Sequence, residues 1–279
     1  MLKKPISLLI ACALLLSLGA CNAKSGNSND NNSSSEEFVA DGKANPDYFS
    51  IGDDGEIMSL SDKGKEQKSL VIPAGYSMKF AMFRGAYKQV AFESDDDIDI
   101  SSAFMGSDTL EAIKLPANIK ILQSSAFSKC TSLKSISFPS GITEIPSRCC
   151  GDDSSLESVT FEGNVTAIGD QAFESCTSLK NLELPDSIVT IGVRAFYSCD
   201  SLDTVTLPKG LKNIGISAFG TTGDGISTFI VPAEMELESW DNTAFVQLGI
   251  TYTVKVSKGS WADTHFDEVF GGQVNKEYV

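Results

Sequence analysis

Residues 172–193, AFESCTSLKNLELPDSIVTIGV, contain the core of a 23-residue pattern that recurs through the middle of the chain. Counting by 23 from Ala103 falls on small residues, and counting from Phe104 falls mostly on phenylalanine, for five consecutive steps without a gap. Regularity over this length establishes a repeat array. Its clearest columns are Ala103, Ala126, Cys149, Ala172, Ala195 and Ala218; Phe104, Phe127, Cys150, Phe173, Phe196 and Phe219; and Leu110, Leu133, Leu156, Leu179 and Leu202.

The first half of each unit has the pattern of a short strand. Apolar residues at Leu182 and Leu184 alternate with polar residues at Asn181 and Glu183. Successive side chains of a strand point to opposite faces, so the leucines are predicted to face inward and the polar pair outward. Pro185 should end the strand because proline donates no ladder hydrogen bond.

The second half of the unit closes the coil. Ile188 and Ile191 predict another short inward-facing segment, and Gly192 favours a tight corner after it. The pair Ala195 and Phe196 then predicts a short helical or 3₁₀ turn. A period of 20 to 29 residues with an L-x-x-L-x-L core is the leucine-rich-repeat signature. The predicted fold is a leucine-rich-repeat solenoid of 23-residue coils, mainly β with short helical or 3₁₀ turns.

A single coil is too small to fold alone. Ordering its backbone costs roughly 1–2 kcal/mol per residue, while each buried apolar side chain contributes roughly 1.5–3 kcal/mol. Neighbouring coils must supply the rest, so both ends of the array need caps. We expect an N-terminal β cap with a degenerate repeat at 38–101, leucine-rich repeats at 102–245 and a C-terminal cap at 246–279. The N-terminal cap should contain a hairpin around Asp53, Asp54 and Gly55.

The consensus AFxxCxSLxxVxLPxxIxxIGxx resembles the BspA-like (treponemal-type) bacterial leucine-rich-repeat family. The resemblance covers about 102–245 and rests on the combination of AF, C-x-SL, LP and IG at fixed offsets. It implies a cell-surface setting and adhesion, either to host extracellular proteins or to other bacteria. It implies no particular ligand.

The N-terminus predicts export. Lys3 and Lys4 precede an apolar run at 6–18, which is too short to span a bilayer but suits a signal-peptide core. The following sequence LGAC, at 18–21, resembles a bacterial lipobox and implies cleavage before Cys21 and acylation of its sulfur. We therefore expect a lipoprotein signal peptide at 1–20 and a membrane-anchored lipoprotein at the outer membrane or cell surface, in contact with the membrane through its lipid only.

Residues 21–37 predict a disordered tether, because they are rich in Asn and Ser and hold almost no large apolar side chain. The chain without its signal carries 20 basic and 37 acidic residues, a net charge of −17. Such a charge disfavours nucleic acid and anionic lipid as partners and favours solubility.

Cysteine has two interpretations. Cys130, Cys176 and Cys199 share one repeat column, where buried thiols act as small hydrophobes. Cys150 occupies the phenylalanine column, and a bridge from it to Cys130 or Cys176 is the alternative. If the space beside Cys150 is unfilled, Cys150→Phe should stabilise the domain by about 1 kcal/mol. Without a C-x₂-C pair or a histidine partner, no metal site is expected at Cys149 or elsewhere.

Neither catalysis nor a cofactor is predicted. The single histidine, His265, lies between Asp263 and Asp267 in the expected C-terminal cap, and a surface histidine is the simpler interpretation. The weaker alternative is an enzyme centred on this residue, which a well-formed pocket around it would support.

An acidic run at 93–99 is a candidate calcium loop. Asp95, Asp97 and Asp99 match the first ligand positions, but Ile100 replaces the required glycine and Gly106 replaces the final glutamate. A solvated turn is the better interpretation.

The remaining candidate site is the outward face of the repeated strands, on rungs about 4.8 Å apart. Solenoid surfaces of this kind often bind proteins, although small polar residues also suit a sheet face with no ligand. A glycan-binding accessory lipoprotein is the alternative function, which aromatic clustering of Trp240 with Tyr252 or Trp261 would favour. The candidate binding ladder comprises Ser135, Ser137, Ser158, Thr160, Asn181, Glu183, Thr204 and Thr206.

Overall fold

The computed structural model describes residues 43–78, 83–96, 98–221, 225–247 and 249–279. All of them belong to one compact unit, Phe38–Val279. The expected signal peptide, Cys21 and the tether lie outside the described residues.

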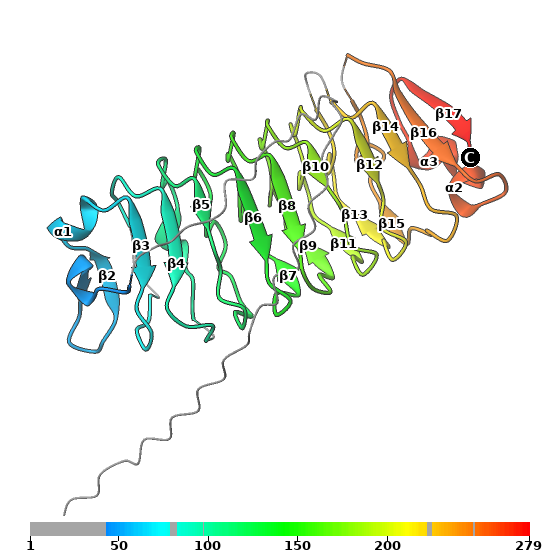
Figure 1. The fold of residues 1–279 in the computed structure, drawn as a ribbon. Coiled ribbons are helices and arrows are strands. Elements are labelled where there is room, and N and C mark those ends of the chain that lie inside the picture. Colours follow the sequence, from blue (N-terminus) through cyan, green and yellow to red (C-terminus); the bar gives the residue numbers. More distant parts are fainter. Residues whose placement is uncertain (1–42, 79–82, 97, 222–224, 248) are drawn as a thin grey trace, which may run out of the picture. The chain divides into compact units, whose positions relative to one another are not determined.

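One side of the solenoid is a six-stranded parallel sheet in the order β10-β8-β6-β5-β4-β3. Each strand pairs with the equivalent residues of the next coil, as in the register of Ile136 with Val159. The 23-residue period therefore places identical columns directly beside one another (Figure 1). The strands are β3 (Ser69–Ile72), β4 (Gln89–Phe92), β5 (Ala112–Ile113), β6 (Ser135–Phe138), β8 (Ser158–Phe161) and β10 (Asn181–Leu182).

A second parallel sheet runs along another side of the coils. It has five strands in the order β15-β13-β11-β9-β7, and its isoleucines at 145, 168, 191 and 214 are buried. The predicted inward orientation of this column is confirmed. The strands are β7 (Glu144–Ile145), β9 (Ala167–Ile168), β11 (Thr190–Ile191), β13 (Asn213–Ile214) and β15 (Ser239–Trp240).

The third side has turns in place of the helices that the Ala-Phe pairs suggest. A 3₁₀ helix, η2 (Ser102–Phe104), forms only in the first of these units among the described residues. Later units carry left-handed residues four positions apart, such as Arg194 at φ 54° and Ser198 at φ 56°. Phe173 N donates to the Ala195 carbonyl oxygen of the next coil at 2.8 Å, whereas Glu174 N donates to the Gln171 carbonyl oxygen of its own turn at 3.2 Å. Because alternate hydrogen bonds leave the turn, the segment does not form a continuous helix.

The phenylalanine column forms the centre of the core. Phe173 and Phe196 stack at 5.3 Å between centroids, and Phe196 and Phe219 stack at 5.1 Å. All three are buried. Their near-parallel rings confirm the repeat phase inferred from the sequence.

Glycine at the corner position allows the backbones of two successive coils to approach closely. A Cβ on Gly215 would lie 2.6 Å from Val193 N, and one on Gly169 would lie 2.7 Å from Ser147 N. Neither glycine has a positive φ. The corner therefore needs glycine because two coils touch there.

The N-terminal cap begins with η1 (Pro46–Tyr48) and the antiparallel hairpin of β1 (Phe49–Ile51) and β2 (Ile57–Leu60). The expected hairpin around Asp53–Gly55 is thus present. Helix α1 (Asp62–Lys65) follows, with Ser61 accepting from Gly64 N as its N-cap. Because β3 and β4 pair in register with the repeats, regular coils begin upstream of residue 102.

The C-terminal cap completes another parallel sheet, in the order β12-β14-β16-β17. Two short helices, α2 (Trp261–Thr264) and α3 (Phe266–Val269), separate its last two strands. None of the described helices is long and apolar enough to cross a membrane. The strands are β12 (Thr204–Thr206), β14 (Thr228–Ile230), β16 (Tyr252–Val256) and β17 (Val274–Tyr278).

Candidate functional site

The candidate binding ladder lies on the outer face of the strands. All eight side chains are exposed or half-buried, whereas the residues between them, such as Ile136, Val159 and Val205, are buried. In register, Ser135 stands beside Ser158 and Ser137 beside Thr160. The strand alternation predicted from sequence thus places these side chains toward solvent.

The ladder is interrupted, contrary to the expectation of one continuous run of rungs. β10 pairs with β8 only at Asn181 and Leu182, and no pairing joins β10 to β12 within the described residues. The second sheet continues through the same coils, because β11 pairs with β13. The coils therefore stay stacked while the strand side opens between residues 181–184 and 204–206.

A hollow of about 270 Å³, which we call the ladder hollow, lies between β8 and β10. Its lining is Ser158, Val159, Thr160, Phe161, Asn181 and Glu183, of which four belong to the predicted ladder. Phe161, Leu182 and Leu184 are only partly buried, although they pack against the core. Apolar surface is consequently accessible at the base of a polar strand face.

The polar groups around the ladder hollow do not form an acid–base pair. Ser137 Oγ donates to Glu162 Oε1 at 2.6 Å on the neighbouring rung. Glu183 forms neither an ion pair nor a side-chain hydrogen bond with any described residue. Such an arrangement suits recognition, since it offers hydroxyls, one open carboxylate and an apolar floor.

Sequence reasoning missed Phe161 as a site residue. Prolines 116, 139, 185 and 208 follow the equivalent strand position in four other coils, but Glu162 follows Phe161. The absent proline was the available signal.

All five described cysteines are buried free thiols. The bridge from Cys150 to Cys130 or Cys176 is not formed. Cys176 Sγ donates to the Cys150 carbonyl oxygen at 3.1 Å, and Cys199 Sγ donates likewise to Phe173 at 3.2 Å. Burial raises the pKa of these thiols, so they stay protonated and pack as small apolar groups.

Asp153 occupies the thiol column in the coil of Cys150, since it lies 23 residues after Cys130. It is fully buried, and its Oδ1 accepts a hydrogen bond from Cys130 N at 2.7 Å. Burial raises the pKa of this carboxyl well above its usual value. A buried carboxyl therefore replaces a thiol in the stack.

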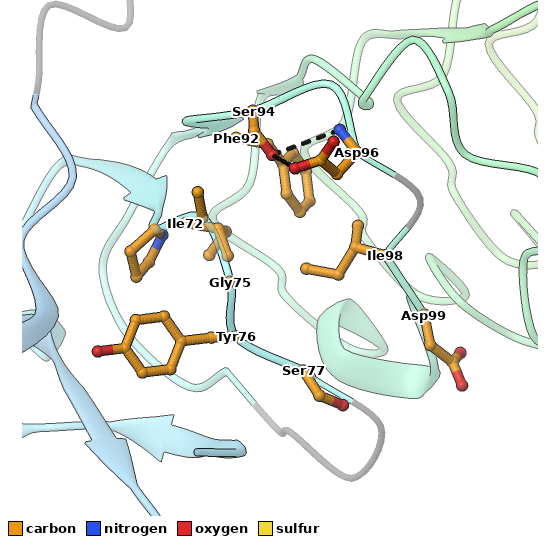
Figure 2. A pocket seen from close by; sticks show the side chains of 11 residues that line it. Ile72, Gly75, Tyr76, Ser77, Phe92, Ser94, Asp96, Ile98 and Asp99 are labelled. Atoms are coloured by element: carbon orange, nitrogen blue, oxygen red, sulfur yellow. Dashed lines mark hydrogen bonds between the residues drawn. The ribbon is translucent and has the colours of Figure 1, made fainter. Parts of the chain in front are cut away.

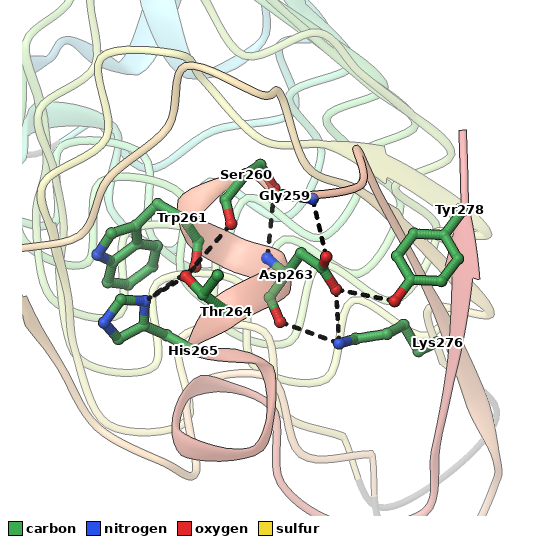
Figure 3. Close-up of polar contacts among 8 residues, drawn as sticks. All are labelled: Gly259, Ser260, Trp261, Asp263, Thr264, His265, Lys276 and Tyr278. Carbon is green, nitrogen blue, oxygen red and sulfur yellow. Dashed lines mark hydrogen bonds and ion pairs between the residues drawn. The ribbon is translucent and has the colours of Figure 1, made fainter.

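The surroundings of His265 are structural (Figure 3). Its ring stacks on Trp261 at 4.5 Å, and Nδ1 donates to the Trp261 carbonyl oxygen at 2.9 Å. Asp263 instead accepts from Gly259 N, Lys276 Nζ and Tyr278 Oη, and the Gly259 bond is the main cause of its pKa falling to about 2. These contacts tie α2 to β17 and direct the Asp263 carboxylate toward Lys276 and Tyr278.

The aromatic cluster named as a sign of glycan binding is partly formed. Trp240 meets Trp261 edge-on at 5.5 Å, and Trp240 Nε1 donates to the Glu268 carbonyl oxygen at 3.2 Å. Tyr252 does not join them, since it is buried against Phe229. The two tryptophans and His265 thus form one half-buried group on the C-terminal cap.

No group of three or more metal-ligating side chains occurs among the described residues. In the acidic run, Asp95 Oδ1 accepts from Ala117 N at 3.2 Å, and Asp99 Oδ1 accepts from Gln123 Nε2 at 3.5 Å. Asp97 lies outside the described residues. Asp95 therefore supports a neighbouring coil, as expected of a turn.

Comparison with known families gives a match to the BspA-type leucine-rich-repeat region, in six copies over residues 97–224. The repeat region belongs to the BspA-type leucine-rich-repeat family. No curated protein matches the sequence of this chain significantly.

Solved structures similar to this chain include the pneumococcal vaccine antigen PcpA, at 13% identity and TM-score 0.47, covering 80% of this chain and 72% of PcpA. The T. pallidum leucine-rich-repeat protein TpLRR is 20% identical with TM-score 0.37, covering 84% and 98%. A leucine-rich-repeat protein from Bacteroides ovatus is 16% identical with TM-score 0.36, covering 82% and 74%.

Proposed function

We propose that this protein is a non-enzymatic cell-surface lipoprotein whose solenoid binds another protein through the ladder hollow. The observation that carries the proposal is a hollow lined by Val159 and the half-buried ring of Phe161, with a polar rim that includes Thr160 and Glu183. Protein interfaces combine an apolar centre with a polar rim in this way. The target class is a host extracellular protein or a protein on another bacterium, as the resemblance to the BspA-like family implies.

The interrupted sheet adds a second reason. Where β10 separates from β8 after Leu182 and does not pair with β12, strand edges face one another without ladder hydrogen bonds. Unpaired strand edges accept backbone hydrogen bonds from an extended partner segment. The small hydroxyl residues Ser158 and Thr160 leave room for that close approach.

The double variant Thr160→Arg/Glu183→Lys should abolish partner binding while leaving the melting temperature nearly unchanged, because both side chains point to solvent. Binding is measured with full-length protein on immobilised extracellular-matrix proteins. The matched control is Thr143→Arg/Glu144→Lys, which makes the same changes at exposed positions near the second sheet. Equal affinity in the Thr160/Glu183 variant would move the interface away from the ladder hollow.

A glycan-binding accessory role is the second candidate, and the Trp240–Trp261–His265 cluster favours it. Aromatic faces stack on apolar faces of sugars, and tryptophan supplies the largest such surface. Binding of the full-length protein to a glycan array that disappears in Trp261→Ala, together with no binding to matrix proteins, would select this function.

The membrane anchor is tested separately. Cys21→Ala should move the protein from membranes to the soluble fraction without changing its melting temperature, since the lipid sulfur would be absent and the folded unit Phe38–Val279 begins well after it. Fractionation with a carbonate wash measures the shift, and Ser25→Ala is the control. A membrane-bound Cys21→Ala protein would remove the basis for the lipid anchor.

A further inference from the structure

A second hollow, of about 370 Å³, lies at the carboxyl ends of β3 and β4, and we call it the N-terminal hollow. Its lining comes from the last residues of those strands, Ile72 and Phe92, and from the segments after them, at 73–77 and at Ser94, Asp96, Ile98 and Asp99. Figure 2 shows Tyr76 and Ile98 on opposite sides of the hollow, with Phe92 and Asp96 toward the top of the view. The hollow lies on different coils from the ladder hollow and shares no residue with it.

The walls are aromatic and aliphatic. Tyr76, Phe92 and Ile98 are half-buried, with one part of each side chain packed against the core. The rest of each side chain borders the opening. A hollow with these walls accommodates an apolar chain or a flat group that stacks on a ring.

The four described acidic residues of this region divide into two pairs. Glu93 Oε2 accepts from Ala74 N at 3.0 Å and Asp95 Oδ1 accepts from Ala117 N, so both hold neighbouring loops. Asp96 and Asp99 line the hollow, and their hydrogen bonds come from the neutral side chains of Ser94 and Gln123. The lining therefore presents two carboxylates that no described cation neutralises.

We infer that the N-terminal hollow binds an arginine side chain of the partner protein, an inference that rests on the proposed protein-binding function. The guanidinium is flat and always charged, and it stacks on aromatic rings while donating to carboxylates. Tyr76 and Phe92 supply the rings, and Asp96 and Asp99 supply the acceptors. The net charge of −17 on the chain without its signal steers a basic segment toward the molecule.

The test uses a blocked peptide, acetyl-Gly-Arg-Gly-amide, titrated into ¹⁵N-labelled full-length protein. The amide signals of Gly75 and Ser77 should shift on binding, and the norleucine analogue of the peptide should bind at least about 10-fold more weakly, because it keeps an apolar stem without the charge. Asp96→Asn/Asp99→Asn should weaken the arginine peptide about 5–10-fold, and Tyr76→Ala should weaken it further.

The control Glu144→Gln/Glu234→Gln removes the same charge at exposed positions outside both hollows and should bind the arginine peptide as the wild type does. Melting temperatures identify any variant that fails to fold. Equal binding of the norleucine peptide, unchanged affinity in Asp96→Asn/Asp99→Asn or absence of shifts at Gly75 and Ser77 would each overturn the inference. The arginine peptide needs no protein partner, so a failure of this peptide to bind does not affect the proposal for the ladder hollow. Conversely, unchanged partner binding in the Thr160/Glu183 variant does not affect the result with the peptide.

Discussion

Phe173→Ala should lower the free energy of unfolding by about 3–5 kcal/mol, which is the range for removal of a fully buried phenylalanine. The ring stacks on Phe196 at 5.3 Å and meets Phe138 edge-on at 6.3 Å. The backbone of Phe173 is held by hydrogen bonds to the next coil, so the coil cannot collapse to fill the cavity. Urea denaturation of the full-length protein measures the loss.

The control is Val189→Ala, which shortens a side chain later in the same repeat at a residue that is 39% exposed. It should change the free energy of unfolding by no more than about 0.5 kcal/mol. A near-neutral Phe173→Ala variant would show that the phenylalanine column does not face the core, and the phase of every coil would then be wrong.

Cys150→Phe should destabilise the protein by about 1–3 kcal/mol, the cost of overpacking a filled core. The structure therefore reverses the sign of the effect that the sequence predicts for this substitution. The ring of Phe138 contacts the ring of Phe173 across the coil that contains Cys150. The space left by the missing phenylalanine is thus occupied by a ring from the strand column.

Phe138→Leu provides the matching test, since Leu115 and Leu207 hold the same column in other coils. Combined with Cys150→Phe, it should restore stability to within about 1 kcal/mol of the wild type, and the coupling between the two sites is then read from a double-mutant cycle by urea denaturation. A stabilised Cys150→Phe single variant would instead mean that the space beside the thiol was empty.

Much of the repeat architecture could be predicted from individual columns of the 23-residue repeat. The 23-residue period predicted the stacking of coils, the inward isoleucines and leucines, and the solvent-facing positions of the ladder. The turn that begins at Ala195 was predicted less well, because a local pattern does not show that alternate N–H groups donate to the next coil and leave the turn without a continuous helix. Whether the ladder binds a partner stays a prediction.

The two hollows illustrate what column analysis omits. Phe161 belongs to an inward column, yet it borders the ladder hollow because β10 separates from β8. Asp96 and Asp99 belong to a run that resembled a solvated turn, and only folding places Tyr76 opposite them. Each hollow forms only because residues from successive coils, about 23 positions apart in the sequence, come together.

The sequence by itself determined the solenoid, its period and the orientation of most side chains, because the alternation of apolar and polar residues within one coil decides which face is buried. Tertiary structure decided where the ladder opens, how Phe138 replaces the ring missing at Cys150, and which carboxylates line the N-terminal hollow. These features arise from contacts between successive coils, where one large or small side chain shifts its neighbours, and such packing leaves no periodic signal within a single repeat.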